Sequence, residues 1–162
     1  MGRWRPPQPK SAPYITPEGY ADLEQESKDL WLKRREVVKA LSEAAAEGDR
    51  SENAEYIYRK KELRGIDRRI RYLQKRMPDL QIVPKRESND AIYFGAWVQL
   101  EDDDGKEHNY RIVGADEIDA KKGFISLDSP LSKLLLGKKI DDEVTLKISE
   151  KTTTYYVLSI AY

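Results

Sequence analysis

The sequence predicts a long antiparallel helical hairpin followed by a small, mostly antiparallel α+β domain with one short helix. Two observations carry this prediction. Apolar residues recur every three or four positions up to Met77 and every second position after Asn89, which is typical of helices first and strands later. Charged residues make up 36% of the 162 residues and hydrophobic residues 39%, a balance typical of long exposed helices that bury only one stripe.

The first helix is expected to begin at Pro17, with Thr16 as its cap, and to end before Gly48. Its seam positions step by alternating three and four residues. They hold Tyr20, Leu23, Ser27, Leu30, Arg34, Val37, Leu41 and Ala44. A second run at the same spacing predicts the partner helix, with Leu63, Ile66, Ile70, Leu73 and Met77 on its seam. The polar pair Ser27 and Arg34 weakens the seam locally and favours one fixed register.

After a polar joint around 84–89, five segments alternate apolar and polar residues and predict strands. They are residues 91–100, 107–114, 123–127, 144–149 and 154–162. Asp104-Gly105 is a strong hairpin-turn signal between the first two. Ser129-Pro130 predicts the start of one short helix that ends by Gly137.

These patterns divide the chain into three parts. Residues 1–13 hold four prolines without periodicity and are expected to form a disordered tail. Residues 14–84 form the arm, with an acidic tip at 48–56, and residues 88–162 form the second domain.

Composition excludes several classes of chemistry. The chain has no cysteine, which excludes disulfide scaffolds and thiolate sites, and its only histidine is His108, which argues against a histidine triad or a histidine zinc cluster. No apolar run approaches the roughly 18 residues that span a bilayer, and no signal-peptide pattern opens the chain. A cytoplasmic protein without membrane contact is expected.

The net charge of zero is an average over unequal blocks. Residues 59–76 carry nine basic side chains against Glu62 and Asp67, for a net charge of +7, between acidic blocks on either side. Such charge separation favours an encounter with a polyanion. The candidate nucleic-acid-binding residues are Arg59, Lys60, Lys61, Arg64, Arg68, Arg69, Arg71 and Lys75. Of these, positions 61, 64, 68, 71 and 75 fall on the face away from the predicted seam and form an all-basic stripe.

The turn at the arm's tip has two compatible interpretations. Asp49 as N-cap with Glu52 three residues on is a variant of the capping box, which would satisfy amides at the start of the second helix. Alternatively, the two carboxylates share one Mg²⁺, a hard cation that often takes only one or two protein carboxylates. Spacing alone leaves both open.

The tip segment GDRSENAEY and the following YRKKELRGIDRRIRYLQK closely resemble the Gre family of bacterial transcript-cleavage factors, and the basic run resembles its GreB branch. The segments YITPEGYADL, FGAWVQLEDDDG and ISLDSPLSKLLLGKKIDDEV resemble the family too. This resemblance implies an FKBP-like second domain that docks on RNA polymerase, and a coiled coil that enters the polymerase secondary channel. It further implies stimulated cleavage of the RNA 3′ end in backtracked complexes.

The resemblance also assigns residues. Asp49 and Glu52 would help to hold a Mg²⁺ shared with the polymerase, with Glu55 a weaker candidate, and Asp128, Ser129 and Pro130 match the docking segment. The basic stripe would contact phosphates of the nascent RNA. No cofactor is expected on the monomer alone, and no catalytic activity of its own.

Several alternatives stay open. The same architecture could serve a channel-occupying inhibitor without cleavage stimulation, or an independent prolyl isomerase. Contact with DNA is also open, because basic patches bind any polyanion. The acidic cluster 101–104 fails the EF-hand spacing, since Leu100 and Arg111 stand where ligands are needed, and is expected to be a solvated hairpin turn next to an exposed His108.

Overall fold

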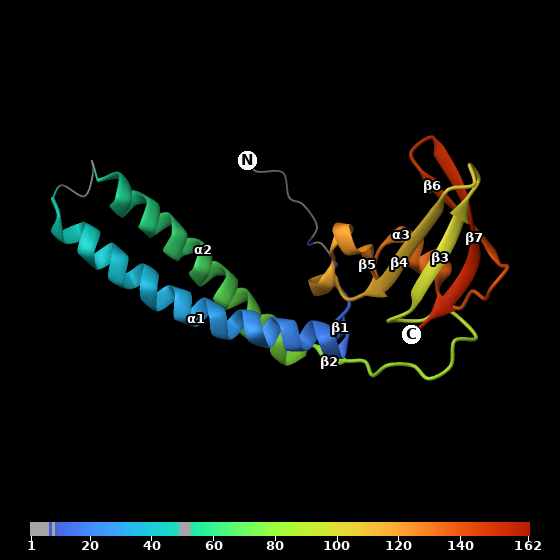
Figure 1. Cartoon of the computed structure of the whole chain (residues 1–162), viewed down its shortest axis with the longest axis horizontal. Coiled ribbons are helices and arrows are strands. Elements are labelled where there is room, and N and C mark those ends of the chain that lie inside the picture. The colour runs from blue at the N-terminus through green and yellow to red at the C-terminus, as the bar shows by residue number, and fades with distance from the viewer. Residues whose placement is uncertain (1–6, 8, 49–52) are drawn as a thin grey trace. The chain divides into compact units, whose positions relative to one another are not determined.

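The computed structural model describes residue 7, residues 9–48 and residues 53–162. Two long helices precede a five-stranded sheet with one short helix, which confirms the predicted fold class (Figure 1). The chain forms two compact units. One is Tyr20–Leu80, and the other is Gln81–Tyr162 together with the chain up to Gly19.

The helical hairpin is built from α1 (Pro17–Ala46) and α2 (Ala54–Arg76), and a 3-10 turn follows at Met77–Asp79. At about 1.5 Å rise per residue, α1 is about 45 Å long. The hydroxyl of Thr16 accepts a hydrogen bond from the amide of Gly19 (3.0 Å), which confirms the predicted cap at the start of α1.

The seam between the two helices combines apolar packing with ion pairs. Val37, Ile66 and Ile70 are buried together, with Leu30 and Leu63 packed against them. Arg34, the polar residue predicted on the seam, pairs with Asp67 across the hairpin at 2.7 Å. Glu26, early in α1, pairs with Arg69, late in α2, and Lys33, further along α1, pairs with Glu62, nearer the start of α2. The two helices therefore run antiparallel. The seam charge therefore has a partner, and this pair is formed in only one register.

The second unit is organised around a sheet with strand order β5-β4-β3-β7-β6. The strands are β3 (Trp97–Asp102), β4 (Glu107–Val113), β5 (Phe124–Ser126), β6 (Glu143–Ile148) and β7 (Lys151–Ala161). Three of the neighbouring pairs are antiparallel, and β4 and β5 run parallel. The sheet is thus mostly antiparallel, as predicted, with one parallel pair at its edge.

One face of this sheet carries the core. Val98, Leu100, Ile112 and Val157 pack with Leu135 of the short helix α3 (Pro130–Leu135). The hydroxyl of Ser129 accepts from the amide of Ser132 at 3.2 Å, so the predicted cap of α3 is confirmed. The predicted hairpin turn is also present, with Gly105 at φ +79°, a conformation that glycine adopts without steric cost.

Three features differ from the sequence prediction or were missed by it. The first strand was predicted from residue 91 but begins at Trp97, because Gly95 adopts φ +86° and Ile92 bonds instead to the loop at Lys138. A two-stranded parallel sheet, β1 (Tyr14–Ile15) with β2 (Gln81–Ile82), was missed, since two residues are too short to show a period. The local sequence does not indicate either that β5 pairs parallel to β4.

The predicted disordered tail lies largely outside the described residues, at positions 1–6 and 8. At its end, Ala12 donates its amide to the carboxylate of Asp128 at 3.0 Å, and the carbonyl of Pro13 accepts from Gln81 at 2.7 Å. The last residues before β1 are therefore hydrogen-bonded to the sheet unit.

The start of α1 is joined to the sheet unit by one carboxylate. Glu117 accepts hydrogen bonds from the amide of Thr16 (3.1 Å), from the hydroxyl of Thr16 and from the amide of Gly114 (2.8 Å). Gly19 leaves room for it, since a Cβ there would lie 2.0 Å from Oε1 of Glu117. Thr16 is only 2% exposed, so these bonds replace those that water cannot supply.

Candidate functional site

The tip of the arm is the segment between Ala46, the last residue of α1, and Ala54, the first residue of α2. Asp49 and Glu52, the predicted metal ligands, lie at 49–52, outside the described residues. On the α1 side of these residues, Gly48 has φ +145°, a conformation that favours glycine. This agrees with its predicted place just past the end of α1.

The cap of the second helix differs from the prediction. Asn53, and not Asp49, is the N-cap of α2, and its side-chain oxygen accepts from the amide of Tyr56 at 3.1 Å. Asparagine is among the strongest N-cap residues, so the sequence held a signal for this role. The capping interpretation of Asp49 is therefore wrong, whereas the metal interpretation stays a prediction.

Glu55, the weaker metal candidate, is engaged in an ion pair within its own helix. Arg59 donates from Nε to Glu55 at 2.9 Å and from Nη1 to Glu62 at 3.0 Å. These hydrogen bonds, above all the one that Arg59 donates to Glu55 and next the one to Glu62, raise the pKa of Arg59 above its ordinary value. The Glu55 carboxylate, in the first turn of α2, is thus engaged by the next turn of its own helix.

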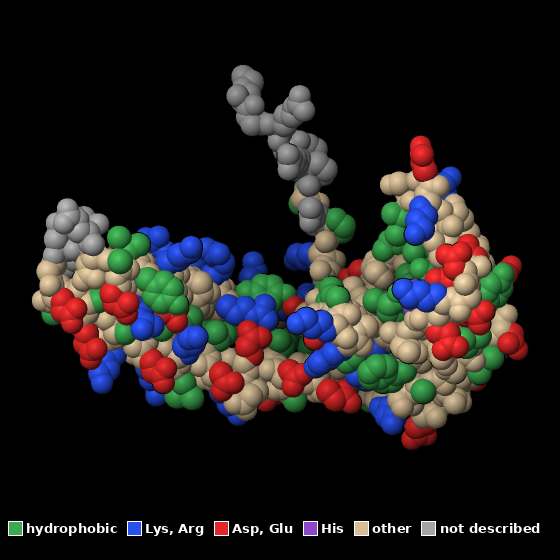
Figure 2. All heavy atoms as spheres, turned by 45° about the horizontal axis from the view of Figure 1, so that its top comes forward, with side chains coloured by type: hydrophobic (Ala, Val, Ile, Leu, Met, Phe, Trp, Pro, Cys, Tyr) green, Lys and Arg blue, Asp and Glu red, His purple; other side chains and the backbone are tan. Residues whose placement is uncertain are grey.

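The basic stripe is exposed as predicted. Figure 2 shows Lys and Arg side chains gathered along α2. The stripe consists of Lys61, Arg64, Arg68, Arg71 and Lys75, all exposed, and Lys60 beside it is exposed too. Among the described residues, none of the five stripe cations forms an ion pair. The stripe therefore exposes positive charge that no described carboxylate pairs with.

Two of the eight candidate nucleic-acid-binding residues are partly buried and paired. Arg59 lies between two carboxylates, as described above. Arg69 forms a two-pronged pair with Glu26 of α1, with N–O distances of 2.6 and 2.9 Å, and its guanidinium lies over the ring of Tyr72. Arg59 is thus paired within α2 and Arg69 links α2 to α1, whereas the stripe residues are exposed.

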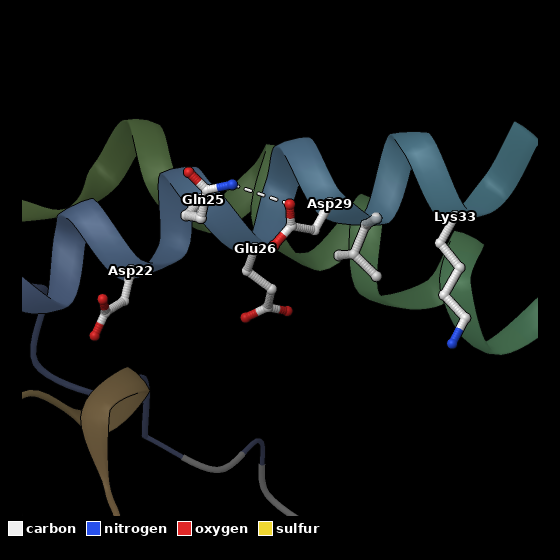
Figure 3. A pocket seen from close by; sticks show the side chains of 6 residues that line it. Asp22, Gln25, Glu26, Asp29 and Lys33 are labelled. Atoms are coloured by element: carbon white, nitrogen blue, oxygen red, sulfur yellow. Dashed lines mark hydrogen bonds between the residues drawn. The ribbon is translucent and has the colours of Figure 1, made fainter.

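A shallow hollow of about 330 Å³ lies along α1, lined by six of its side chains (Figure 3). Gln25 donates to Asp29 at 2.9 Å within it. Glu26, also in its lining, is the partner of Arg69, whose hydrogen bond lowers the pKa of Glu26 below its ordinary value. These polar side chains are engaged within the arm itself. Sequence reasoning did not single out this hollow.

The predicted docking segment lies at the start of α3. Asp128 and Pro130 are exposed, and Ser129 is half-buried as the helix cap. Leu134 and Leu136, a turn further on, are each 37% exposed. An exposed proline and two exposed leucines around a fixed helix start can contact another protein, and this accessible surface is compatible with the docking prediction.

The acidic cluster forms the β3–β4 turn. Carboxylates of Asp102, Asp103 and Asp104 lie within 4.8 Å of one another. Asp102 accepts from the backbone amides of the turn and lies 2.8 Å from Nε2 of His108. His108, predicted to be exposed, is half-buried with its side chain 20% exposed, because its ring stacks on Tyr110.

Protonation of Asp102 is expected to loosen this turn. Hydrogen bonds from His108 and then from the Lys106 amide hold the pKa of Asp102 below its ordinary value. A carboxyl group with a lowered folded-state pKa stabilises the fold above its unfolded-state pKa of about 3.9, and this contribution is lost as the pH falls through the folded-state value.

The test is urea denaturation of the wild type and of Asp102→Asn at about pH 6 and about pH 3. The wild type should lose more stability than the variant over this interval. Equal losses would show that the Asp102–His108 pair does not contribute to the pH dependence of folding.

A long two-helix arm with an exposed basic stripe, together with a small sheet unit, defines the class: a two-part protein with a helical hairpin and a mostly antiparallel sheet. Comparison with known proteins assigns the family. Family models described as "Transcription elongation factor, N-terminal" and "Transcription elongation factor, GreA/GreB, C-term" match residues 13–82 and 87–162. The chain belongs to the GreA/GreB family of transcription elongation factors.

Two relatives named as GreB agree with this assignment. "Transcription elongation factor GreB" of Xanthomonas axonopodis pv. citri (strain 306) is 54% identical, covering 100% of this chain and 98% of the relative. The protein of the same name from Pseudomonas aeruginosa is 51% identical with the same coverage. Among solved structures, the GreA factor homolog 1 (Gfh1) protein of Thermus thermophilus matches at 26% identity and a TM-score of 0.42, over 92% of this chain and 98% of that one.

In the part of the chain that the structure describes, no helix is both long and apolar enough to cross a membrane.

Proposed function

We propose that this protein binds RNA polymerase, inserts its helical arm into the secondary channel and stimulates cleavage of the extruded RNA 3′ end in backtracked complexes. One observation carries the proposal: the loop at the end of the arm holds the two acids of the motif GDRSENAEY, which resembles the tip of the cleavage factors. Membership of the GreA/GreB family supports RNA polymerase as the partner.

In this proposal the tip acids are ligand donors to an active site that the polymerase supplies. Asp49 and Glu52 offer hard carboxylate oxygens, the donor type that Mg²⁺ prefers. A Mg²⁺ ion bound there would stabilise charge on the attacking and leaving oxygens of phosphodiester hydrolysis. The protein's own contribution is to hold two ionised carboxylates near the reacting phosphate.

The basic stripe would hold the extruded RNA. Its five cations lie on successive turns of α2, so that they can follow a strand of phosphates. Such contacts position the RNA without reading its sequence. The docking of the sheet unit near the channel mouth, through Asp128, Ser129 and Pro130, would add affinity for the polymerase.

The test uses stalled, backtracked RNA polymerase complexes that carry a labelled transcript and Mg²⁺. Adding the wild-type protein should shorten the transcript from its 3′ end, whereas the protein alone should leave free RNA intact. Binding to the polymerase without any shortening would refute the cleavage function and favour a channel-occupying inhibitor. Shortening of free RNA would instead identify an independent nuclease.

A separate prediction concerns the basic stripe. Replacing Arg64, Arg68 and Arg71 by alanine should weaken action on long extruded RNA and lower the salt slope of RNA binding by about two, at about 0.7 per phosphate contact on a single strand. The matched control removes the same charge from α1, where Lys28, Arg35 and Lys39 are also exposed. An equal change of slope in both triple variants would show a general charge effect and no specific contact.

A further inference from the structure

A row of exposed residues on α2 combines aromatic rings, cations and a glycine. The row advances by alternating three and four residues, the spacing that keeps side chains on one face of a helix. It consists of Tyr58, Lys61, Gly65, Arg68, Tyr72 and Lys75, all exposed. Three of the six are cations of the basic stripe. The two tyrosines and the glycine halfway between them are not explained by that stripe.

The two tyrosines do not contribute to the seam between the helices. The buried cluster of the arm consists of aliphatic side chains, and neither tyrosine belongs to it. Tyr58 is 59% exposed and Tyr72 is 43% exposed. Packing in the seam therefore does not account for aromatic residues at these two positions.

Each ring is accompanied by a guanidinium that is itself fixed. Arg59 lies 5.6 Å from the ring centroid of Tyr58, and Arg69 lies 5.2 Å from that of Tyr72. Both arginines are held by carboxylates, the first within α2 and the second from α1. Such contacts restrict the motion of the rings, and a restricted ring loses less conformational freedom when it binds a ligand.

Gly65 is not required by the fold. Its backbone is helical, in the interior of α2, where glycine is less favourable than alanine. Among the described residues, only its chain neighbours and the backbone of its own helix lie within 4 Å of the place where a Cβ would stand. The missing side chain leaves a low place on the helix surface between the two rings, where a ligand can approach the backbone closely.

The spacing of the row suits a strand that runs along the helix. Tyr58 and Tyr72 are 14 positions apart, which at 1.5 Å per residue is about 21 Å along the helix. Neighbouring bases of a stacked strand are about 3.4 Å apart. The two rings would therefore contact different bases of one strand, and the cations between them, Lys61 and Arg68, would meet its phosphates.

We propose that Tyr58 and Tyr72 stack on bases of single-stranded RNA, while Gly65 leaves room for the strand between them. A positively charged surface combined with aromatic rings is the arrangement that binds single strands without sequence preference. Duplex RNA is a poor ligand for such rings, because its bases are already paired and stacked. This inference deepens the role proposed for the basic stripe and rests on that role, not on RNA cleavage.

The first test removes both rings without removing charge. The Tyr58→Leu, Tyr72→Leu double variant of the full chain is titrated against a fluorescent single-stranded oligoadenylate of about 12 nucleotides, followed by anisotropy. Its affinity should fall by at least about fivefold. The salt slope should stay at the wild-type value, since every phosphate contact is kept. An abasic oligomer with the same number of phosphates should bind the wild type and the variant equally.

The second test separates binding from stability. Gly65→Leu places a bulky, helix-favouring side chain between the rings, so that the protein should melt at the same or a higher temperature. Its affinity for oligoadenylate should nevertheless fall by about fivefold, because the low place is filled. The matched control is Gln74→Leu, at an exposed position of α2 outside the row, which should bind like the wild type. Wild-type affinity in Gly65→Leu would overturn the role of the glycine.

A third measurement observes the rings directly. In NMR spectra of the wild type, the ring protons of Tyr58 and Tyr72 should move upfield on addition of oligoadenylate and stay in place on addition of the abasic oligomer. Equal affinity of the wild type for the two oligomers, or unchanged affinity in the double tyrosine variant, would overturn the stacking role.

The outcomes also distinguish this inference from the proposed function. If the wild type binds no single-stranded RNA, the role of the basic stripe fails together with this inference. If the wild type prefers the base-bearing oligomer through Tyr58 and Tyr72 but does not shorten the transcript of backtracked polymerase, the cleavage function fails and the stacking role stands.

Discussion

Replacing Asp49 by asparagine and Glu52 by glutamine should abolish stimulated RNA cleavage while leaving polymerase binding within about twofold. Each substitution keeps the size of the side chain and removes its charge, so the loop loses two ionised ligands for a hard cation. A single change should also lower the rate strongly, because an oxygen left neutral is a much weaker ligand. The measurement is the rate of transcript shortening at saturating factor, over a series of Mg²⁺ concentrations.

The matched control for this variant removes two acids elsewhere on the same arm. Glu36→Gln with Glu43→Gln makes the same change in net charge at exposed positions of α1. It should cleave at the wild-type rate. If the tip variant and the control behaved alike, either both active or both inactive, the assignment of the metal ligands to the tip would be wrong.

Replacing Glu117 by alanine should produce the largest loss of stability predicted for this chain, about 3 kcal/mol, since hydrogen bonds to a charged group each contribute about 1.5–3 kcal/mol. The change leaves the amide and hydroxyl of Thr16, a residue only 2% exposed, without the carboxylate that accepts their hydrogen bonds. Urea denaturation measures the effect. Because Glu117 joins the start of α1 to the sheet unit, hydrogen exchange at Thr16 should also become faster.

Two comparisons make this prediction specific. Ile118→Ala, at a neighbouring side chain that is 58% exposed, should change stability by less than about 0.5 kcal/mol. Glu117→Gln keeps an acceptor of the same length and should recover part of the loss. A Glu117→Ala protein as stable as the Ile118→Ala protein would show that Thr16 and Gly114 find other partners.

Much of the fold could be predicted because local signals and long-range packing agree. Thr16 with Pro17 marks the start of α1, Gly48 marks its end, and the apolar spacing of Ile66 and Ile70 matches the buried seam. The outward stripe follows from the same period, since residues that avoid the seam must face outward. Ser129 likewise caps α3 as its sequence context indicates.

The features of the fold that could not be predicted depend on contacts between residues far apart in the sequence. Nothing local shows that Tyr14–Ile15 would pair with Gln81–Ile82, or that β5 would run parallel to β4. Asp49 and Asn53 are both good N-cap residues, and the contact of Asn53 with Ala44 favours the second. The tip acids themselves rest on the motif and the family, since residues 49–52 lie outside the described part of the chain.

The absence of a side chain at Gly19 has an evolutionary consequence. Because a Cβ at this position would meet the Glu117 carboxylate at 2.0 Å, a larger residue at position 19 requires the side chain at position 117 to move or to be shorter. A relative with a larger residue at position 19 is expected to carry a shorter one at position 117, although the two are 98 positions apart in the sequence. An alignment of many relatives should therefore show these two positions varying as a pair, and such covariation would mark the place where α1 meets the sheet unit.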